Sequence, residues 1–272
     1  MGLAVVQAPE LLSDGAGNDF LTREIGALVD VTFVGSGDAF GTGGRFQTCI
    51  LLDAPGCRAA VDFGASSLVA LNRMGISHNS IDVVILSHLH GDHCGGVPFL
   101  LLDAMLGAKR TKPLTIAGPR ETKQRLAEIG VALFPGMETM TPKFNLSIVE
   151  MEVLKKHHVG GITVTPFPAR HTPRTNPTAV RVEIGGKVVA YTGDGEWTTH
   201  TPDLGADADL LIVECYAYDK PIQFHMNYPA VLAHWEEFGA KRIVLTHMGP
   251  EMLARSEAIP QECAHDGLVI TV

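Results

Sequence analysis

The chain has 272 residues, 46% of them hydrophobic, which is enough to bury the core of one large domain. Its formal net charge of −9 disfavours functions that rely on a basic surface, such as non-specific binding to nucleic acids or to anionic membranes. The five cysteines form no CxxC pair, no apolar run reaches the roughly 20 residues of a membrane span, and no signal peptide is evident, so we expect a cytoplasmic protein without a membrane partner.

The chain opens with a segment of mixed character. We interpret residues 1–28 as an N-terminal extension packed on the body, and residues 29–272 as a single domain. Residues 28–34 predict a strand, which a glycine-rich loop over 35–44 follows. The loop has no lysine and does not match the phosphate-binding pattern G-x-x-x-x-G-K-[ST]. We therefore expect it to lie close to a functional site, where glycines allow close backbone approach.

Strands and helices then alternate through the first half. Apolar runs bounded by turn residues predict strands over 48–52, 58–63, 81–86 and 114–117. Helices are predicted over 66–74, with Ser66 as the N-cap, over 95–106, and over 120–129, where Gly130 ends the last one. This order of elements indicates a layered α/β arrangement.

The second half repeats the pattern. Strands are predicted over 144–154, 162–167, 178–184, 187–191, 209–213, 242–246 and 267–272, with one helix over 228–238. Residues 157–161 are interpreted as the turn between the first two of these strands, and Gly185-Gly186 as a hairpin turn. Two β-rich halves with helices outside them predict an α/β fold built as a four-layer αββα sandwich.

The stretch directly after the predicted strand 81–86 has residue types suited to metal binding. It places His88, His90, Asp92 and His93 within six residues. Imidazole and carboxylate are costly to bury unpaired, and together they are ligands of zinc, and of manganese or iron when more carboxylate is present. His88 and His90, two apart in an extended chain, point the same way and can hold one metal. Asp92 and His93 come later and can reach a second.

Polar residues follow three more predicted strands. These are His171, Asp194 and His247. In layered α/β folds, sites gather where strands end and loops begin, so one binuclear metal site is the simplest account of all these residues. Asp62 is either a polar partner of this site or a surface aspartate. Cys94 is a possible ligand, although a small buried thiol fits it better.

The ordered set of site residues resembles the metallo-β-lactamase superfamily over residues 29–250. The segments FVGSGD at 33–38, YTGD at 191–194 and LTH at 245–247 resemble its tRNase Z-like branch, which includes tRNA-processing nucleases, cyclic phosphodiesterases and arylsulfatase-like enzymes. This resemblance implies a first metal held by His88, His90 and His171, a second held by Asp92, His93 and His247, and Asp194 as the bridge between them. A bridging aspartate rather than a cysteine argues against a zinc β-lactamase.

The implied chemistry is hydrolysis. Two divalent ions, zinc first and manganese or iron as alternatives, lower the pKa of a bridging water and hold it as hydroxide, while Asp92 orients it. By resemblance, His225 stands where phosphodiesterases of this branch have a histidine that protonates the leaving group. Glu214 stands where they have the acidic residue that pairs with that histidine. A surface histidine is the alternative for His225. We treat His78, His200 and His265 as surface residues.

The substrate is expected to be a small anionic ester. The tRNA-processing members have a long Gly/Pro-rich arm that nothing here matches, and the loop after Gly41 lacks their Pro and Lys. A large tRNA is therefore disfavoured, and a phosphodiester or cyclic phosphate is favoured. A sulfate ester, a lactone, a thioester, or metal binding without turnover are the alternatives. A homodimer is expected only because it is common in the branch.

Overall fold

The computed structural model describes residues 28–272. The expected N-terminal extension over residues 1–28 therefore lies outside the described residues, apart from Leu28. Among the described residues, no helix combines the length and apolar character needed to cross a bilayer.

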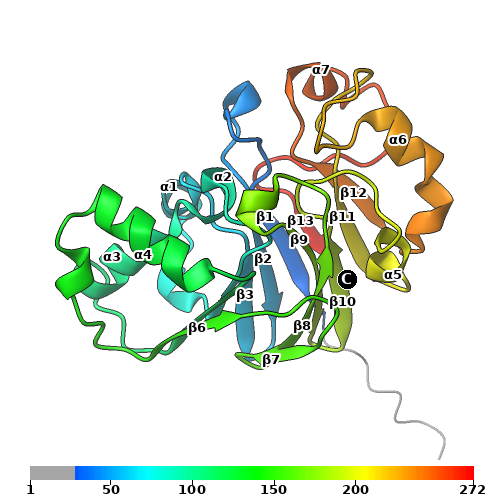
Figure 1. Cartoon of the computed structure of the whole chain (residues 1–272). Coiled ribbons are helices and arrows are strands. Elements are labelled where there is room, and N and C mark those ends of the chain that lie inside the picture. Colours follow the sequence, from blue (N-terminus) through cyan, green and yellow to red (C-terminus); the bar gives the residue numbers. More distant parts are fainter. Residues whose placement is uncertain (1–27) are drawn as a thin grey trace, which may run out of the picture.

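Two β-sheets pack face to face at the centre of the molecule (Figure 1). The first has seven strands in the order β13-β1-β2-β3-β4-β5-β6, and the second has six in the order β12-β11-β10-β9-β8-β7. The first sheet is formed by β1 (Asp30–Gly35), β2 (Cys49–Ala54), β3 (Cys57–Val61), β4 (Val83–Ile85), β5 (Leu114–Gly118), β6 (Leu146–Glu150) and β13 (Val269–Thr271). The second is formed by β7 (His157–Val159), β8 (Ile162–Pro168), β9 (Thr178–Ile184), β10 (Lys187–Tyr191), β11 (Leu210–Glu214) and β12 (Ile243–Thr246).

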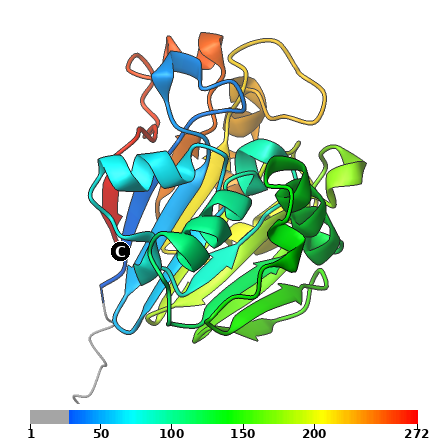
Figure 2. The ribbon, with the colours of Figure 1, turned by 90° about the vertical axis from the view of Figure 1, so that its left-hand side faces the viewer.

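Helices cover the outer face of each sheet. The helices are α1 (Ser67–Arg73), α2 (Gly91–Cys94), α3 (Val97–Leu106), α4 (Thr122–Leu133), α5 (Thr201–Gly205), α6 (Tyr228–Ala233) and α7 (Pro250–Leu253). α1, α3 and α4 lie over the first sheet, and α5 and α6 lie over the second (Figures 1 and 2). The predicted four-layer αββα sandwich is thus confirmed.

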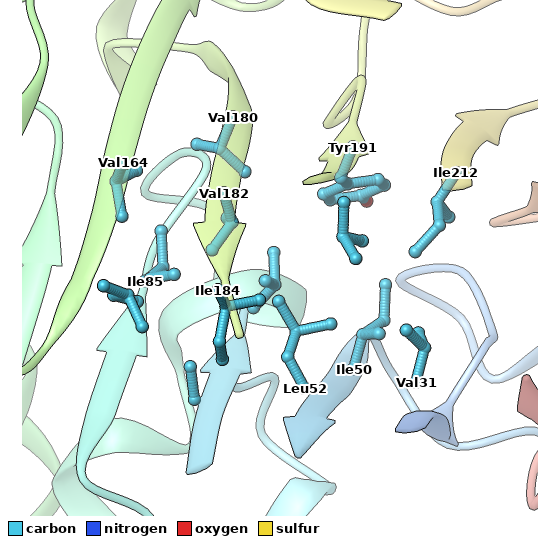
Figure 3. Close-up of a cluster of buried hydrophobic side chains, with 14 of the residues drawn as sticks. Val31, Ile50, Leu52, Ile85, Val164, Val180, Val182, Ile184, Tyr191 and Ile212 are labelled. Atoms are coloured by element: carbon cyan, nitrogen blue, oxygen red, sulfur yellow. The ribbon is translucent and has the colours of Figure 1, made fainter. Parts of the chain in front are cut away.

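The two-residue period of a strand explains how each sheet serves two cores. In β2, Ile50 and Leu52 face the other sheet, whereas Cys49 and Leu51 face the helices. Figure 3 shows the core between the sheets, where Ile50 and Leu52 of the first sheet meet apolar side chains of the second. Because β2 is buried on both faces, its sequence is almost continuously apolar, and the same holds for β4 and β11.

Five local predictions are wrong, and one of them is the strand over 144–154, which ends at Glu150 as β6. Residues 157–159 form β7, paired with β8, so the turn is made by Gly160-Gly161 alone, both with positive φ. α4 runs through Gly130 to Leu133. The predicted helix 228–238 is interrupted at His234, after which a 3₁₀ turn begins. Ser66 makes no capping bond to α1, because its hydroxyl accepts the backbone N–H of Gln47 at 2.8 Å.

Candidate metal centre

The residues singled out at strand ends meet at one end of the sandwich. α2 and α7, which follow β4 and β12, lie at that same end (Figure 1). His88 and His90 follow β4, and Asp92 and His93 lie within α2. The other three come from the second sheet and follow β8, β10 and β12 in turn: His171, Asp194 and His247. These seven side chains form two adjacent clusters.

The imidazole cluster consists of His88, His90 and His171. His90 Nδ1 lies 3.2 Å from His88 Nε2 and 3.0 Å from His171 Nε2. His171 donates its Nδ1 proton to the backbone carbonyl of Phe224 at 2.9 Å. In its neutral form, His171 therefore directs the lone pair of Nε2 at the other two rings.

The carboxylate cluster consists of Asp92, His93, Asp194 and His247, all of them buried. His93 Nε2 lies 3.2 Å from Asp92 Oδ2 and 3.3 Å from Asp194 Oδ1. His247 Nε2 lies 3.3 Å from Asp92 Oδ2 and 3.4 Å from Asp194 Oδ2. Each imidazole thus faces both carboxylates.

The donor set fits divalent metal ions. In the imidazole cluster, three convergent nitrogens share too few protons to satisfy one another by hydrogen bonds, whereas one cation satisfies all three lone pairs. In the carboxylate cluster, His93 Nε2 and Asp194 Oδ1 are buried without a hydrogen-bond partner. Buried polar atoms of this kind are rare unless a ligand or water meets them. The residues present are therefore suited to hold a metal pair.

Close backbone packing keeps the ligand segments together. A side chain on Gly64 would place its Cβ 2.2 Å from the carbonyl oxygen of Asp92, so only glycine allows α2 to lie this close to the chain after β3. His247 has a φ of 56°, the left-handed region that non-glycine residues rarely adopt. Strain of this kind is typical of functional sites, where the surrounding fold holds the residue in place.

Asp62 is a buried partner of the centre and not a surface residue. Its Oδ2 accepts His93 Nδ1 at 2.7 Å and the hydroxyl of Ser87 at 2.7 Å, while its Oδ1 accepts the backbone N–H of Ser87. The same hydroxyl lies 3.1 Å from His88 Nδ1. Asp62 and Ser87 therefore orient one imidazole of each cluster. Ser87 lies directly before His88 in the sequence, but its contact with Asp62 depends on tertiary structure.

The two clusters differ in electrostatics. Burial lowers the pKa of His88 well below its ordinary value, and the neighbouring His93 lowers it further. Burial lowers the pKa of His90 as well, and the neighbouring His171 lowers the pKa of His90 further. For His247, burial acts in the same direction, but Asp194 and Asp92 outweigh it and raise the pKa to about 9. For His93, the carboxylates around it likewise outweigh burial and raise the pKa well above its ordinary value.

Glu214 and His225 form a further pair beside the metal ligands. Glu214 is fully buried, and its Oε2 accepts the backbone N–H groups of Gly195 and Met226 at 3.0 and 3.1 Å. Its Oε1 accepts a hydrogen bond from His225 Nδ1. Burial would lower the pKa of His225, but the hydrogen bond and the charge of Glu214 raise it. This places an imidazole, oriented by a buried carboxylate, close to His247.

A cavity of about 380 Å³ opens over these groups. It is lined by His90, Asp92, His171, Asp194, His225, His247, Phe40, Tyr216, Ala39 and Ile222. The glycine-rich loop 35–44 thus borders the centre, as expected. The sequence does not mark Phe40, Tyr216 or Ile222 as site residues, because isolated apolar residues in loops have no periodic signal.

The remaining histidines lie away from the centre. His78 was expected at the surface, but it is only 7% exposed, and its Nε2 lies 2.7 Å from Asp103 Oδ2. That prediction is wrong because Asp103, on α3, supplies the partner that makes burial tolerable. His265 is exposed and His200 is partly exposed. Cys94 is a buried thiol and does not belong to either cluster.

Comparisons with known proteins agree with this architecture. A sequence model of the Beta-lactamase superfamily domain matches residues 51–248, more than half of the chain. Ribonuclease Z of Agathobacter rectalis is 25% identical over 288 aligned residues, which cover 86% of this chain and 92% of that protein. The alignment is longer than this chain, so the relative carries inserted residues.

Two solved structures resemble the fold. The metallo-beta-lactamase fold protein YhfI of Bacillus subtilis aligns with a TM-score of 0.73 at 23% identity, over 90% of this chain and all of that one. The short form of human tRNase Z aligns with a TM-score of 0.71 at 22% identity, over 89% of this chain and 98% of that one. The expected fold and resemblance are confirmed by these comparisons.

Proposed function

Because the chain belongs to the β-lactamase superfamily and is a metal-dependent hydrolase, we propose that it hydrolyses phosphodiester bonds at a pair of divalent metal ions. The observation that supports this most directly is the meeting of the two ligand clusters with the Glu214–His225 pair around one cavity. A phosphodiester needs groups that stabilise charge on phosphorus oxygens and a separate group that protonates the leaving oxygen. Both kinds of group border this cavity.

The proposed metal ligands divide as the two clusters do. His88, His90 and His171 would hold the first ion, while Asp92, His93 and His247 would hold the second, with Asp194 between them. When bound, such ions polarise the ester oxygens and make a water nucleophilic at neutral pH. The imidazole-rich donor set favours zinc, with manganese and iron as alternatives.

The protein groups supply orientation and a proton. Asp92 borders the cavity and is proposed to accept a hydrogen bond from the attacking water, which aims a lone pair of that water at phosphorus. His225 has its Nδ1 bound to Glu214, so Nε2 is the nitrogen that can donate to the leaving-group oxygen. As the oxygen–phosphorus bond to water forms, that water loses one proton through Asp92 to solvent; the bond to the leaving group breaks, and the His225 proton goes to the departing oxygen.

A small phosphodiester or cyclic phosphate is the proposed substrate class. No lysine or arginine lines the cavity over the centre. A neighbouring groove of about 1000 Å³ reaches His171, and its charged lining residues balance: Arg120 and Arg170 against Glu150 and Glu152. A groove of balanced charge is poorly suited to hold a long run of phosphates.

With five free cysteines, one of them unpaired in any pairing scheme, we also propose a reducing compartment, the cytoplasm.

RNA is the second candidate substrate. It is favoured by the name of the aligned relative, Ribonuclease Z, which covers most of both chains. A short RNA with a 3′ extension would use the same bond chemistry, so the two candidates differ in what binds outside the cavity. The alternatives of a sulfate ester, a lactone, a thioester or metal binding without turnover are separated by the experiment below. That the protein forms a homodimer stays a prediction, which a measurement of its molar mass by light scattering would test.

The experiment is steady-state hydrolysis of bis(p-nitrophenyl) phosphate by zinc-loaded and by manganese-loaded protein, with metal content measured alongside. We expect turnover and two ions per chain in the wild type. In Asp92→Ala, we expect a loss on the order of a thousandfold in kcat/KM and loss of the second ion first. The matched control is Asp203→Ala, an exposed aspartate outside the cavity, which is expected to change neither quantity.

Three outcomes decide between the candidates. Unchanged activity in Asp92→Ala with two ions still bound would reject the role given to Asp92. Two ions without turnover of any phosphodiester would move the assignment to sulfate esters, lactones and thioesters, and failure to hydrolyse those as well would leave metal binding without turnover. Turnover of a 3′-extended RNA at a far higher kcat/KM than of cyclic phosphates would select the second candidate.

A further inference from the structure

The most exposed large hydrophobic side chain among the described residues lies at the mouth of the catalytic cavity. Phe40 is 81% exposed to solvent. It nevertheless lines the same cavity as His90, Asp92 and His225. A phenyl ring left in water is unfavourable for the free protein, and one that borders a site offers a flat apolar surface to whatever binds there.

The loop that carries Phe40 is fixed by a buried carboxylate. Asp38 is fully buried, and its Oδ1 accepts the backbone N–H groups of Phe40 at 3.2 Å and of Thr42 at 2.9 Å. Its Oδ2 accepts the hydroxyl of Thr42 at 2.7 Å. Gly41 follows with a φ of 65°, which turns the chain back immediately after the phenylalanine. The backbone under the ring is thus set before any ligand arrives.

Two further apolar or aromatic side chains line the same cavity. Ile222 is 42% exposed and lines the cavity together with Tyr216. The loop beyond Ile222 is held in turn, since Glu196 Oε1 accepts the backbone N–H of Phe224 at 2.8 Å. Outside the metal ligands and His225, the cavity therefore offers the aromatic rings of Phe40 and Tyr216 together with the side chains of Ala39 and Ile222, without a lysine or arginine.

We propose that Phe40 is a specificity-determining residue that stacks on an aromatic ring borne by the substrate's ester group, a nucleobase or an aryl group. This inference rests on the proposed function and narrows it to phosphodiesters with a planar ring close to the phosphorus. Base–aromatic stacking is tolerant of ring identity, so the same surface accepts either source of ring. Preorganisation of the loop by Asp38 lowers the entropy lost on binding.

Phe40 contributes little to the fold, which makes it suitable for mutation. With four fifths of its surface exposed, truncation removes little buried area, so Phe40→Ala is expected to keep the thermal midpoint of the wild type. Phe40→Trp keeps a ring, and Phe40→Leu keeps apolar volume without one. Val69→Ala, which shortens an exposed apolar residue on α1 outside the cavity, is the matched control.

The test is calorimetric binding of non-reacting anions to zinc-loaded protein, so it does not depend on turnover. Phenylphosphonate is compared with methylphosphonate, and thymidine 5′-monophosphate with 2-deoxyribose 5-phosphate; within each pair only one compound has a planar, unsaturated ring. We expect the ring to tighten binding to the wild type by about tenfold. Phe40→Ala and Phe40→Leu should lose that gain, Phe40→Trp should retain it, and the affinities of the anions without a planar ring should change less than about twofold.

The outcomes separate this inference from the proposed function. The pair that shows the Phe40-dependent gain identifies the source of the ring as an aryl group or a nucleobase. An equal affinity within both pairs, a gain that survives Phe40→Ala, or no detectable anion binding would overturn the inference. Hydrolysis of bis(p-nitrophenyl) phosphate is measured separately. Turnover without a role for Phe40 would support the proposed function and overturn this inference. Stacking without turnover would support stacking by Phe40 and overturn the proposed function.

Discussion

The two clusters of the centre are both suited to bind a metal ion, but they differ in their side chains and in their charge. The imidazole cluster of His88, His90 and His171 has no carboxylate, and His90 is only partly buried. The carboxylate cluster pairs two imidazoles with two carboxylates, and all four side chains are buried. The pKa values follow this difference, because they fall for His88 and His90 and rise for His93 and His247.

This difference shows what holds each cluster together without a metal. In the carboxylate cluster, opposite charges attract, and contacts of 3.2 to 3.4 Å are those of ion pairs. In the imidazole cluster, burial and the neighbouring histidines outweigh the attraction of Asp92 and Asp194 for His88 and His90, so charge does not draw the rings together. Their contacts of 3.0 and 3.2 Å are imposed by the strand ends and by the Phe224 carbonyl that orients His171. The fold therefore preorganises one cluster, while electrostatics contributes to the other.

The largest expected effect comes from the residue proposed to join the clusters. Asp194→Ala should lower the metal content from two ions per chain to nearly none and reduce kcat/KM by on the order of a thousandfold or more, because both ions lose a ligand. His88→Ala should lose one ion only. Metal content by plasma emission spectrometry measures this, with the partly exposed His200→Ala as control. An Asp194→Ala chain that keeps one ion firmly bound would show that the clusters act separately.

A smaller effect is expected from the residues that orient the imidazoles. Asp62→Asn removes the charge that binds His93 Nδ1, and should weaken the second ion by about 10 to 100-fold in affinity. Ser87→Ala removes a neutral hydroxyl beside His88 and should weaken the first ion by less. Zinc competition against a chromophoric chelator gives both affinities. Equal losses at both ions in the two variants would show that Asp62 and Ser87 act as one unit.

Sequence reasoning located this centre because its signal is local. Each proposed ligand lies in a segment that directly follows an apolar run, and the ends of such runs meet at one edge in layered α/β folds. The hairpin of β9 and β10 was also predicted residue by residue, since Gly185-Gly186 leaves one choice of turn. That the clustered residues hold metal stays a prediction.

What the sequence did not predict depends on contacts between distant segments. Asp62 was weighed equally as a surface residue, because its partners Ser87 and His93 lie more than twenty residues away. His78 was misplaced at the surface for the same reason, since Asp103 pairs with it from α3. The sequence around Phe40 has no hydrophobic periodicity. Only its position in the lining of the cavity shows that this exposed side chain belongs to the site.

The smallest expected effect is the pH dependence of the metal-free chain, and its sign tests the comparison directly. A raised folded-state pKa stabilises the fold below the ordinary pKa of about 6.5, and that stability is lost as pH rises through the folded value. His247, at about 9, should therefore make the metal-free chain less stable between pH 6.5 and 9. His88 has a lowered pKa, so its protonation in the unfolded chain should reduce stability as pH falls below about 6.5.

Imidazole NMR shifts of the metal-free protein at pH 7.5 separate these contributions. His247 and His93 should be protonated, while His88 should be neutral, and urea unfolding should show a stability maximum near the ordinary histidine pKa. Asp194→Asn removes the charge that raises the pKa of His247 most, so it should lower that pKa and reduce the loss of stability at alkaline pH. If His88, His93 and His247 all titrated near the ordinary histidine pKa, the two clusters would not differ in electrostatics. The contrast between a cluster held by the fold and one held by charge would then disappear.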